Sequence, residues 1–255
     1  MSVLLLLRHG ESTANADDVF GGWLDYPLTA RGREQAKTAG QLIHAAGLDP
    51  EAVHTSLLTR AVDTADTVLA ETTDPVRAVT RSWRLNERHY GAFQGRSRGS
   101  VRAEFGDEAL ERWRRSYDAA PPALSSQSGH AALTDIEMPL TESLADVRSR
   151  LLPYWHESIA SDLIADRITL VVAHGNSIRA LCMYLDGLST EQIRSLNIPT
   201  GVPLRYDLDE RLTPRISGGE YLVDDSSEQH ERITGNPSTA TTPAYRSGSS
   251  FPRRR

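Results

Sequence analysis

The chain has 255 residues, 39% of them hydrophobic and 24% charged, which is typical of one globular α/β domain with a sizeable core. A formal net charge of −6 argues against a general nucleic-acid-binding protein, and no apolar run is long enough to span a membrane. The apolar run 3–7 is too short for a secretion signal and lacks its basic flank, so cytoplasm is the expected compartment. The single cysteine, Cys182, excludes an internal disulfide.

The first predicted element is a strand over Val3–Leu7. It is wholly apolar, without polar alternation, so we expect it to be buried on both faces. It stops at Arg8, His9 and Gly10. In open α/β sheets, ligands bind at the carboxyl ends of the strands, which makes this arginine and histidine candidates for a binding site. A lone His-Gly pair is, however, more often an ordinary loop.

The next elements follow a βαβαβ order, which predicts a parallel sheet with right-handed crossovers. Thr29 is the expected N-cap of the first helix and Gly47 its expected end. Ser56 is the expected cap of the second helix. We predict helices over 29–47 and 57–72 and strands over 52–55 and 76–79.

The middle of the chain predicts a helix over 100–117 and a Pro/Ser/Gly loop over 119–139. A loop of that length is usually a lid, a binding loop or a disordered insert. Thr141, with Glu142, is the expected cap of a helix whose apolar face runs from Leu144 to Trp155. Residues 202–208 alternate, which favours a strand near the sheet edge, and 219–223 predict a last short strand.

A second buried strand, Ile168–Ala173, also ends in a histidine and a glycine, His174 and Gly175, and a helix follows it over 178–185. If the two His-Gly strands are neighbours, both imidazoles reach one crevice. Neutral imidazole is a nucleophile, and its cation donates hydrogen bonds to phosphate. From residue 224 the composition shifts to Ser, Thr, Pro, Gly and Arg, so we expect a catalytic domain over 1–223 and a disordered tail over 224–255.

These residue types suit phosphoryl transfer through a histidine. Arginines pair bidentately with phosphate, and a carboxylate, Glu11 or Glu87, can exchange protons with a substrate hydroxyl. The sequence contains no metal-ligand motif, so no metal is expected. Six arginines, if gathered in one cleft, would attract small anions: Arg8, Arg60, Arg88, Arg98, Arg114 and Arg115.

Together the motifs resemble the 2,3-bisphosphoglycerate-dependent phosphoglycerate mutases of the histidine phosphatase superfamily. The Arg-His-Gly triplet alone is typical only of the superfamily, whereas the Glu87 block with the Arg114–Arg115 pair and the block 197–201 is far more specific to the mutase branch. The resemblance covers roughly residues 3–210. It rests on 7–12, 22–25, 28–29, 55–56, 60–61, 85–91, 113–115, 139–144, 173–177 and 197–201.

The resemblance implies an α/β fold of three layers, α/β/α, with a mostly parallel central sheet. It implies an isomerase of glycolysis and gluconeogenesis that interconverts 3-phosphoglycerate and 2-phosphoglycerate, primed by 2,3-bisphosphoglycerate and needing no metal. His9 would become the phosphohistidine and Glu87 would donate and accept the proton, with His174 as the third catalytic residue. The substrate would be held by Arg8, Asn15, Gly21, Gly22, Arg60, Arg88, Tyr90, Arg98, Arg114, Arg115, Gly175 and Asn176.

Several positions depart from the family pattern. Gly21 stands where the family usually has threonine or serine, Asp18 where it has asparagine, Arg98 where it has lysine, and Ala14 where tryptophan is common. The 119–139 loop is shorter than usual and the tail is longer. These departures bear on how tightly the site holds its ligand and excludes water, and leave the expected fold unchanged.

Two other functions fit the same residues. A phosphatase for small phosphorylated metabolites would use the same phosphohistidine and let water take the phosphoryl group. The third possibility is a non-catalytic binding protein on this fold. We favour it less because both histidines, Glu87 and the arginines are all present. In each case the ligand is a small phosphorylated molecule, and the family leads us to expect a homodimer or homotetramer.

Overall fold

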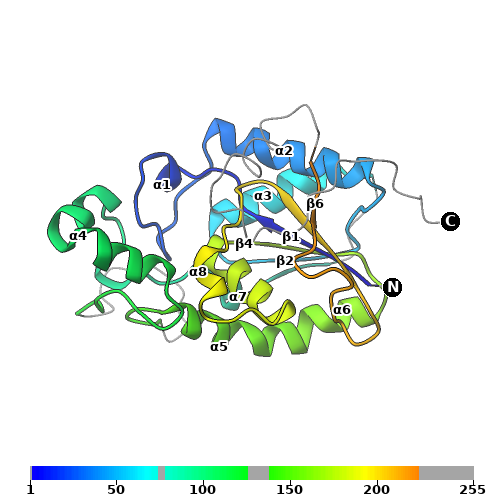
Figure 1. The fold of residues 1–255 in the computed structure, drawn as a ribbon. Coiled ribbons are helices and arrows are strands. Elements are labelled where there is room, and N and C mark those ends of the chain that lie inside the picture. Colours follow the sequence, from blue (N-terminus) through cyan, green and yellow to red (C-terminus); the bar gives the residue numbers. More distant parts are fainter. Residues whose placement is uncertain (1, 74–77, 126–137, 224–255) are drawn as a thin grey trace.

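The computed structural model describes residues 2–73, 78–125 and 138–223 (Figure 1). The expected tail over 224–255, most of the 119–139 loop and the start of the 76–79 strand lie outside the described residues.

One six-stranded sheet forms the centre of the molecule, in the order β3-β2-β4-β1-β5-β6. The pairs β1–β4, β2–β4 and β2–β3 are parallel, whereas β5 is antiparallel to β1 and β6 to β5. The mostly parallel sheet is therefore confirmed, and β5 lies one strand from the edge, as its alternating pattern predicts. The strands are β1 Ser2–Arg8, β2 Ala52–Thr55, β3 Ala78–Arg81, β4 Thr169–Ala173, β5 Pro203–Leu208 and β6 Glu220–Tyr221.

Helices cover both faces of this sheet, which is why β1 carries no polar alternation. Leu4 and Leu6 belong to the core on one face, and Val3, Leu5 and Leu7 to the core on the other. Figure 1 shows α2 and α3 on one side of the strands and α5, α6 and α7 on the other. These helices are α2 Ala30–Ala45, α3 Thr59–Ala70, α5 Leu144–Tyr154, α6 Ala160–Ile164 and α7 Gly175–Leu185, with a π-helical turn Trp155–Ile159 joining α5 to α6.

A smaller lobe lies beyond one end of the sheet and is packed around Phe20, Phe93, Val101 and Leu110. Its long helix, α4, matches the predicted helix but bends at Gly106, whose φ is +84°. The remaining elements are α1 Thr13–Ala16, α4 Arg98–Arg115, α8 Gln192–Ser195 and the 3₁₀ turns Trp83–Leu85 and Gly91–Phe93.

Two of the three expected helix caps are wrong. Thr29 caps α2 as predicted, because its hydroxyl accepts a hydrogen bond from the backbone N–H of Gly32 at 3.0 Å. The N-cap of α5 is Ser143 rather than Thr141, and the N-cap of α3 is Leu58 rather than Ser56. The hydroxyl of Thr141 donates to the Pro121 carbonyl instead. Short polar residues bond to whichever backbone group the tertiary structure brings near, so a one- or two-residue shift of a cap is expected.

Within the described ranges, no helix is long and apolar enough to cross a membrane.

Candidate active site

The two strand ends that carry a histidine followed by a glycine lie side by side, which is the arrangement that would bring both imidazoles to one crevice. Strands β1 and β4 are adjacent and parallel, with Arg8 opposite Ala173. The backbone N–H of His9 donates to the Ala173 carbonyl at 3.0 Å, which extends the pairing by one residue. The rings of His9 and His174 lie 4.9 Å apart between centroids, and both side chains are buried.

His9 is held in one tautomer by its neighbour. Its Nδ1 lies 2.7 Å from the carbonyl oxygen of Gly10, which can only accept, so Nδ1 carries the proton and Nε2 keeps its lone pair. A side chain at Gly10 would place Cβ 2.1 Å from the Gly32 carbonyl oxygen, so the close approach of this segment to α2 requires glycine. Burial, followed by the charges of Arg60 and Arg8, holds the pKa of His9 well below its usual range. The imidazole is therefore neutral at pH 7, as a nucleophile requires.

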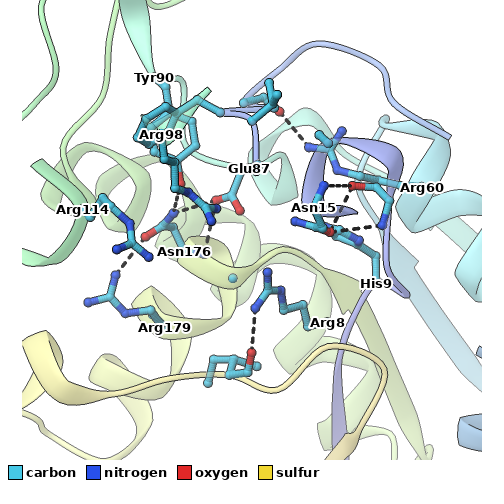
Figure 2. Close-up of a pocket in the computed structure, with 18 of the residues that line it drawn as sticks. Arg8, His9, Asn15, Arg60, Glu87, Tyr90, Arg98, Arg114, Asn176 and Arg179 are labelled. Atoms are coloured by element: carbon cyan, nitrogen blue, oxygen red, sulfur yellow. Dashed lines mark hydrogen bonds between the residues drawn. The ribbon is translucent and has the colours of Figure 1, made fainter. Parts of the chain in front are cut away.

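Figure 2 shows the cavity into which His9 faces. Thirteen of the fifteen predicted site residues line it: Arg8, His9, Asn15, Gly21, Gly22, Arg60, Glu87, Tyr90, Arg98, Arg114, Arg115, Gly175 and Asn176. The lining also includes residues that the sequence analysis did not select: Ser12, Ala14, Val19, Phe20, Arg179, Asn197 and Ile198. Segments from six separate stretches of the chain thus converge on one site.

The cavity is strongly cationic. Among the residues that the structure describes, six arginines line it and Glu87 is the only acidic residue of the lining. Burial, as the largest cause, lowers the pKa of Arg60 to about 10 and that of Arg179 to about 9, so both stay protonated at neutral pH. A surface of this kind in a cleft attracts and orients small polyanions. The six arginines are Arg8, Arg60, Arg98, Arg114, Arg115 and Arg179.

Backbone carbonyls fix the two arginines nearest His9. Arg60 donates from NH1 to the Leu24 carbonyl at 2.9 Å and from NH2 to the Gly22 carbonyl at 2.7 Å. Arg8 donates from NH1 to the Ile198 carbonyl at 2.9 Å, while its buried Nε has no hydrogen-bond partner among the described residues. A buried charged donor without a partner is costly, so Arg8 is suited to an anion that supplies the missing acceptor.

Glu87 has two unlike carboxylate oxygens. Oε1 accepts from the backbone N–H of Arg88 at 2.8 Å, the backbone N–H of Asn176 at 3.2 Å and the Asn176 amide Nδ2 at 3.0 Å. No hydrogen bond to Oε2 is found in the part of the chain that the structure describes. The carboxylate lines the cavity, so one oxygen is tied to the protein and the other is available there. Glu11, the other candidate, is not in this lining and accepts from the Thr29 hydroxyl at 2.9 Å.

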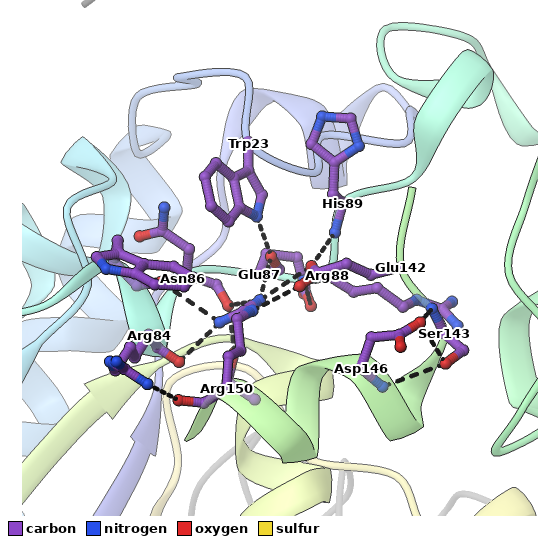
Figure 3. Close-up of polar contacts among 12 residues, drawn as sticks. Trp23, Arg84, Asn86, Glu87, Arg88, His89, Glu142, Ser143, Asp146 and Arg150 are labelled. Atoms are coloured by element: carbon purple, nitrogen blue, oxygen red, sulfur yellow. Dashed lines mark hydrogen bonds and ion pairs between the residues drawn. The ribbon is translucent and has the colours of Figure 1, made fainter. Parts of the chain in front are cut away.

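A buried clamp holds the backbone that carries Glu87 (Figure 3). Arg150 and Glu142 form a two-pronged ion pair, at 2.6 Å and 3.1 Å. The same guanidinium donates to the carbonyls of Asn86 at 2.9 Å and Glu87 at 3.0 Å, and Trp23 Nε1 donates to the Glu87 carbonyl at 2.6 Å. With its partners so satisfied, the pair fixes the position of Glu87 relative to α5.

Two predicted site residues do not line the cavity. Arg88 is buried behind it, with its guanidinium carbon 4.8 Å from the centroid of the Tyr90 ring. His174 lies behind His9, and its Nε2 lies 2.8 Å from the hydroxyl oxygen of Ser56. The Ser56 hydroxyl therefore makes two hydrogen bonds. One is to His174, 118 positions away in the sequence, and in the other it accepts from the Leu58 N–H at 3.2 Å.

Arg179 is the main lining residue that the sequence analysis missed. It is one helical turn after Asn176 in α7, and residues three apart share a helix face. That spacing could have identified it once Asn176 was a candidate. Among the described residues, no group of three or more His, Cys, Asp or Glu side chains is placed to hold a metal ion.

Comparisons with known proteins place these residues in a family. The profile of the histidine phosphatase superfamily (branch 1) matches residues 4–211. The chain is 51% identical over 237 residues to a 2,3-bisphosphoglycerate-dependent phosphoglycerate mutase of Thermobifida fusca (strain YX), covering 90% of this chain and 96% of that one. It is 47% identical over 222 residues to a phosphoglycerate mutase of Candida albicans, covering 84% and 90%.

Among solved structures, the chain is similar to a mycobacterial glucosyl-3-phosphoglycerate phosphatase in complex with VO3. The TM-score is 0.64 at 28% identity, and the match covers 81% of this chain and 93% of that one. An alpha-ribazole phosphatase from Shigella flexneri matches with a TM-score of 0.62 at 25% identity, over 84% of this chain and 94% of that one.

Proposed function

The chain belongs to branch 1 of the histidine phosphatase superfamily, and from that premise we propose that it is a 2,3-bisphosphoglycerate-dependent phosphoglycerate mutase. It interconverts 3-phosphoglycerate and 2-phosphoglycerate and so acts as an isomerase of glycolysis and gluconeogenesis. The observation that carries the proposal is the cavity in which neutral His9 faces six arginines and, among the described residues, a single carboxylate, Glu87. Identity near 50% to proteins named as such mutases, over most of both chains, supports the same activity.

In the proposed mechanism, Nε2 of His9 attacks the phosphorus atom while Arg8 and Arg60 offset the charge on the transferring oxygens. Phosphoryl transfer needs mainly positioning and electrostatic stabilisation, and both arginines are fixed in place by backbone carbonyls. Glu87 protonates the leaving hydroxyl oxygen, and in the return step it removes the proton from the attacking hydroxyl.

The cavity suits a ligand with two phosphates, because its arginines lie both beside His9 and on α4, at Arg114 and Arg115. When bound, 2,3-bisphosphoglycerate supplies the phosphoryl group that primes His9. Arg98, Arg114 and Arg115 then hold the second phosphate or the carboxylate of the ligand. The buried Arg8 Nε, which has no partner among the described residues, is suited to one of these anionic oxygens.

Hydrolysis of small phosphate esters is the second candidate. The solved structures named above are phosphatases, and they share 25–28% identity with this chain. The two activities differ in whether a hydroxyl of the retained ligand or water takes the phosphoryl group from His9. We expect a homodimer or homotetramer in the cytoplasm, as the family resemblance implies.

The test is a pair of rates on one preparation of the full chain. Formation of 2-phosphoglycerate from 3-phosphoglycerate and release of free phosphate are measured together, with and without 2,3-bisphosphoglycerate, in excess EDTA. We expect isomerisation that depends on the bisphosphate, survives chelation and exceeds phosphate release. Phosphate release without isomerisation would assign the enzyme to the phosphatases, and His9→Ala provides the blank for both rates.

A further inference from the structure

The amide of Asn176 can adopt only one orientation, and Arg179 sets it (Figure 2). Arg179 NH1 donates to Asn176 Oδ1 at 2.9 Å. A guanidinium has donors and no acceptor, so the atom facing it must be the amide oxygen. Nδ2 of Asn176 therefore points the other way, where it donates to Glu87 Oε1 at 3.0 Å and to the Tyr90 hydroxyl at 2.9 Å.

Arg179 is itself fixed. Its NH2 donates to the Ile193 carbonyl at 2.6 Å and reaches the Arg115 carbonyl at 3.4 Å. The side chain is buried at the edge of the cavity, so these bonds are shielded from water. The guanidinium thus joins α7 to α8 and to the end of α4, and it presents one N–H to Asn176.

We infer that Arg179 is a positioning residue that acts through Asn176 to keep Glu87 Oε1 occupied, so that Oε2 alone exchanges the proton with substrate. Oε1 receives three hydrogen bonds, two of them from Asn176, whereas Oε2 receives none from the described residues. A Cβ at Gly175 would lie 3.8 Å from Oε2 and 3.7 Å from Arg8 Cζ. The absence of a side chain at Gly175 leaves that space open for substrate.

The step balances at named atoms. As the phosphorus forms its bond to His9 Nε2, its bond to the substrate oxygen breaks, and that oxygen takes the proton from Glu87 Oε2. In the return step, Oε2 takes the proton from the attacking hydroxyl and the electron pair of the P–N bond returns to Nε2. If the Asn176 amide turned over, its oxygen would face Oε1, and the carboxylate would lose a donor and rotate. This inference rests on the proposed function, which supplies the substrate hydroxyl.

The test compares two phosphoryl donors. The leaving group of p-nitrophenyl phosphate departs as the phenolate and needs no proton. The leaving group of 2,3-bisphosphoglycerate is an alkoxide, which needs a proton as it departs. We expect Arg179→Met to slow isomerisation by about 10-fold or more, which is part of the roughly 10²- to 10⁴-fold that acid–base catalysis contributes. We expect it to change the burst of p-nitrophenolate, which reports phosphorylation of His9, by less than about 3-fold, because that step needs no proton. Arg194→Met, at an exposed arginine of α8, is the matched control.

A double-mutant cycle separates this role from a loss of packing. Asn176→Ala should reproduce the selective loss, and Arg179→Met should add little in the Asn176→Ala background, because both remove the same link. Arg179→Lys, which keeps a cationic hydrogen-bond donor but loses the planar guanidinium, should recover part of the rate. The inference would be overturned if Arg179→Met slowed isomerisation and the p-nitrophenolate burst equally. It would also be overturned if the effects of Arg179→Met and Asn176→Ala were fully additive.

Failure of the proposed function is distinguishable from failure of this inference. If the unmodified enzyme hydrolyses phosphate esters and does not isomerise, the mutase assignment fails. The inference is then tested on hydrolysis, by comparing glycerol phosphate with p-nitrophenyl phosphate. A loss confined to glycerol phosphate supports it, and an equal loss overturns it.

Discussion

Asp18 and Arg98 form an ion pair at the edge of the cavity. Both positions depart from the pattern of related mutases, which usually have asparagine and lysine there, and the structure shows that the two departures are partners. The backbone N–H of Arg98 also donates to the Asp18 carbonyl at 2.8 Å. The Asp18 carboxylate is thus paired with an arginine of the cavity and does not itself line the cavity.

Asp18→Asn is expected to strengthen anion binding. The substitution removes a negative charge and frees Arg98, and asparagine tolerates the positive φ of 53° at this position. Because the carboxylate is largely exposed, we expect only about a 2- to 5-fold gain in affinity for 3-phosphoglycerate, greater at low salt. Calorimetric titration of the variant measures it. Asp17→Asn, an exposed neighbour with the same change in charge, is the control, and an equal gain there would reject the pairing as the cause.

His9 is expected to carry the phosphoryl group. Incubation with 2,3-bisphosphoglycerate should give an acid-labile, base-stable phosphoprotein, and His9→Ala should abolish the label. His44→Ala, at an exposed histidine, should keep it. Because His174 lies behind His9 and outside the cavity lining, His174→Ala should lower the label without moving it to another residue. A labelled His9→Ala protein would show that the nucleophile is elsewhere.

Glu87→Gln is expected to lower isomerisation by about 10²- to 10⁴-fold, which is the usual contribution of acid–base catalysis. The donors around Oε1 should hold the glutamine oxygen there, leaving an amide nitrogen where the proton-carrying oxygen was. Steady-state rates with 3-phosphoglycerate test this. Glu11→Gln should lose far less, because Glu11 lies outside the lining beside His9, and equal losses would contradict the assignment.

Gly21→Thr is expected to tighten bisphosphate binding and lower the ratio of phosphatase to mutase rates. The added hydroxyl can donate to a phosphate, and a hydrogen bond to a charged group is worth roughly 1.5–3 kcal/mol, or about 10- to 150-fold in affinity. The new Cβ would lie 3.3 Å from Ala14 Cβ, a tight contact that Thr and Val share. Gly21→Val is therefore the matched control. If both variants change the ratio equally, the hydroxyl is not responsible.

Stability is expected to fall as the pH drops below about 6.5, the ordinary pKa of histidine. Burial, as the largest cause, lowers the pKa values of His9, His174 and His54. Below pH 6.5 the unfolded chain therefore binds more protons than the folded one. The free energy of unfolding includes the whole contribution of these histidines above that pH and decreases below it. Each such histidine contributes up to about 1.4 kcal/mol per pH unit.

Urea unfolding at several pH values measures this slope. Because glutamine does not titrate, His9→Gln should lower this slope by up to the amount that one proton contributes, about 1.4 kcal/mol per pH unit. An unchanged slope in His9→Gln would show that His9 is not a source of the acid sensitivity.

Local pattern determined much of this protein. Continuous apolar runs predicted β1 and β4, because strands covered on both faces have no reason to alternate, and glycines after their histidines marked the turns. The resemblance to a known family added most of the site residues, and thirteen of the fifteen line one cavity.

Tertiary structure decided the rest, because contacts between distant segments leave no periodic trace in the chain. Only the pairing of β1 with β4 places the buried ring of His174 against that of His9, and His174 does not line the cavity although it lies in a matching motif. Arg88 also lies in a matching motif, and it too is buried outside the lining. Only the approach of α8 to α7 gives Arg179 the Ile193 carbonyl that fixes it, and with it the orientation of Asn176. A hydrogen bond between residues far apart in sequence depends on the geometry of the whole fold, and a motif specifies only residue types and their spacing.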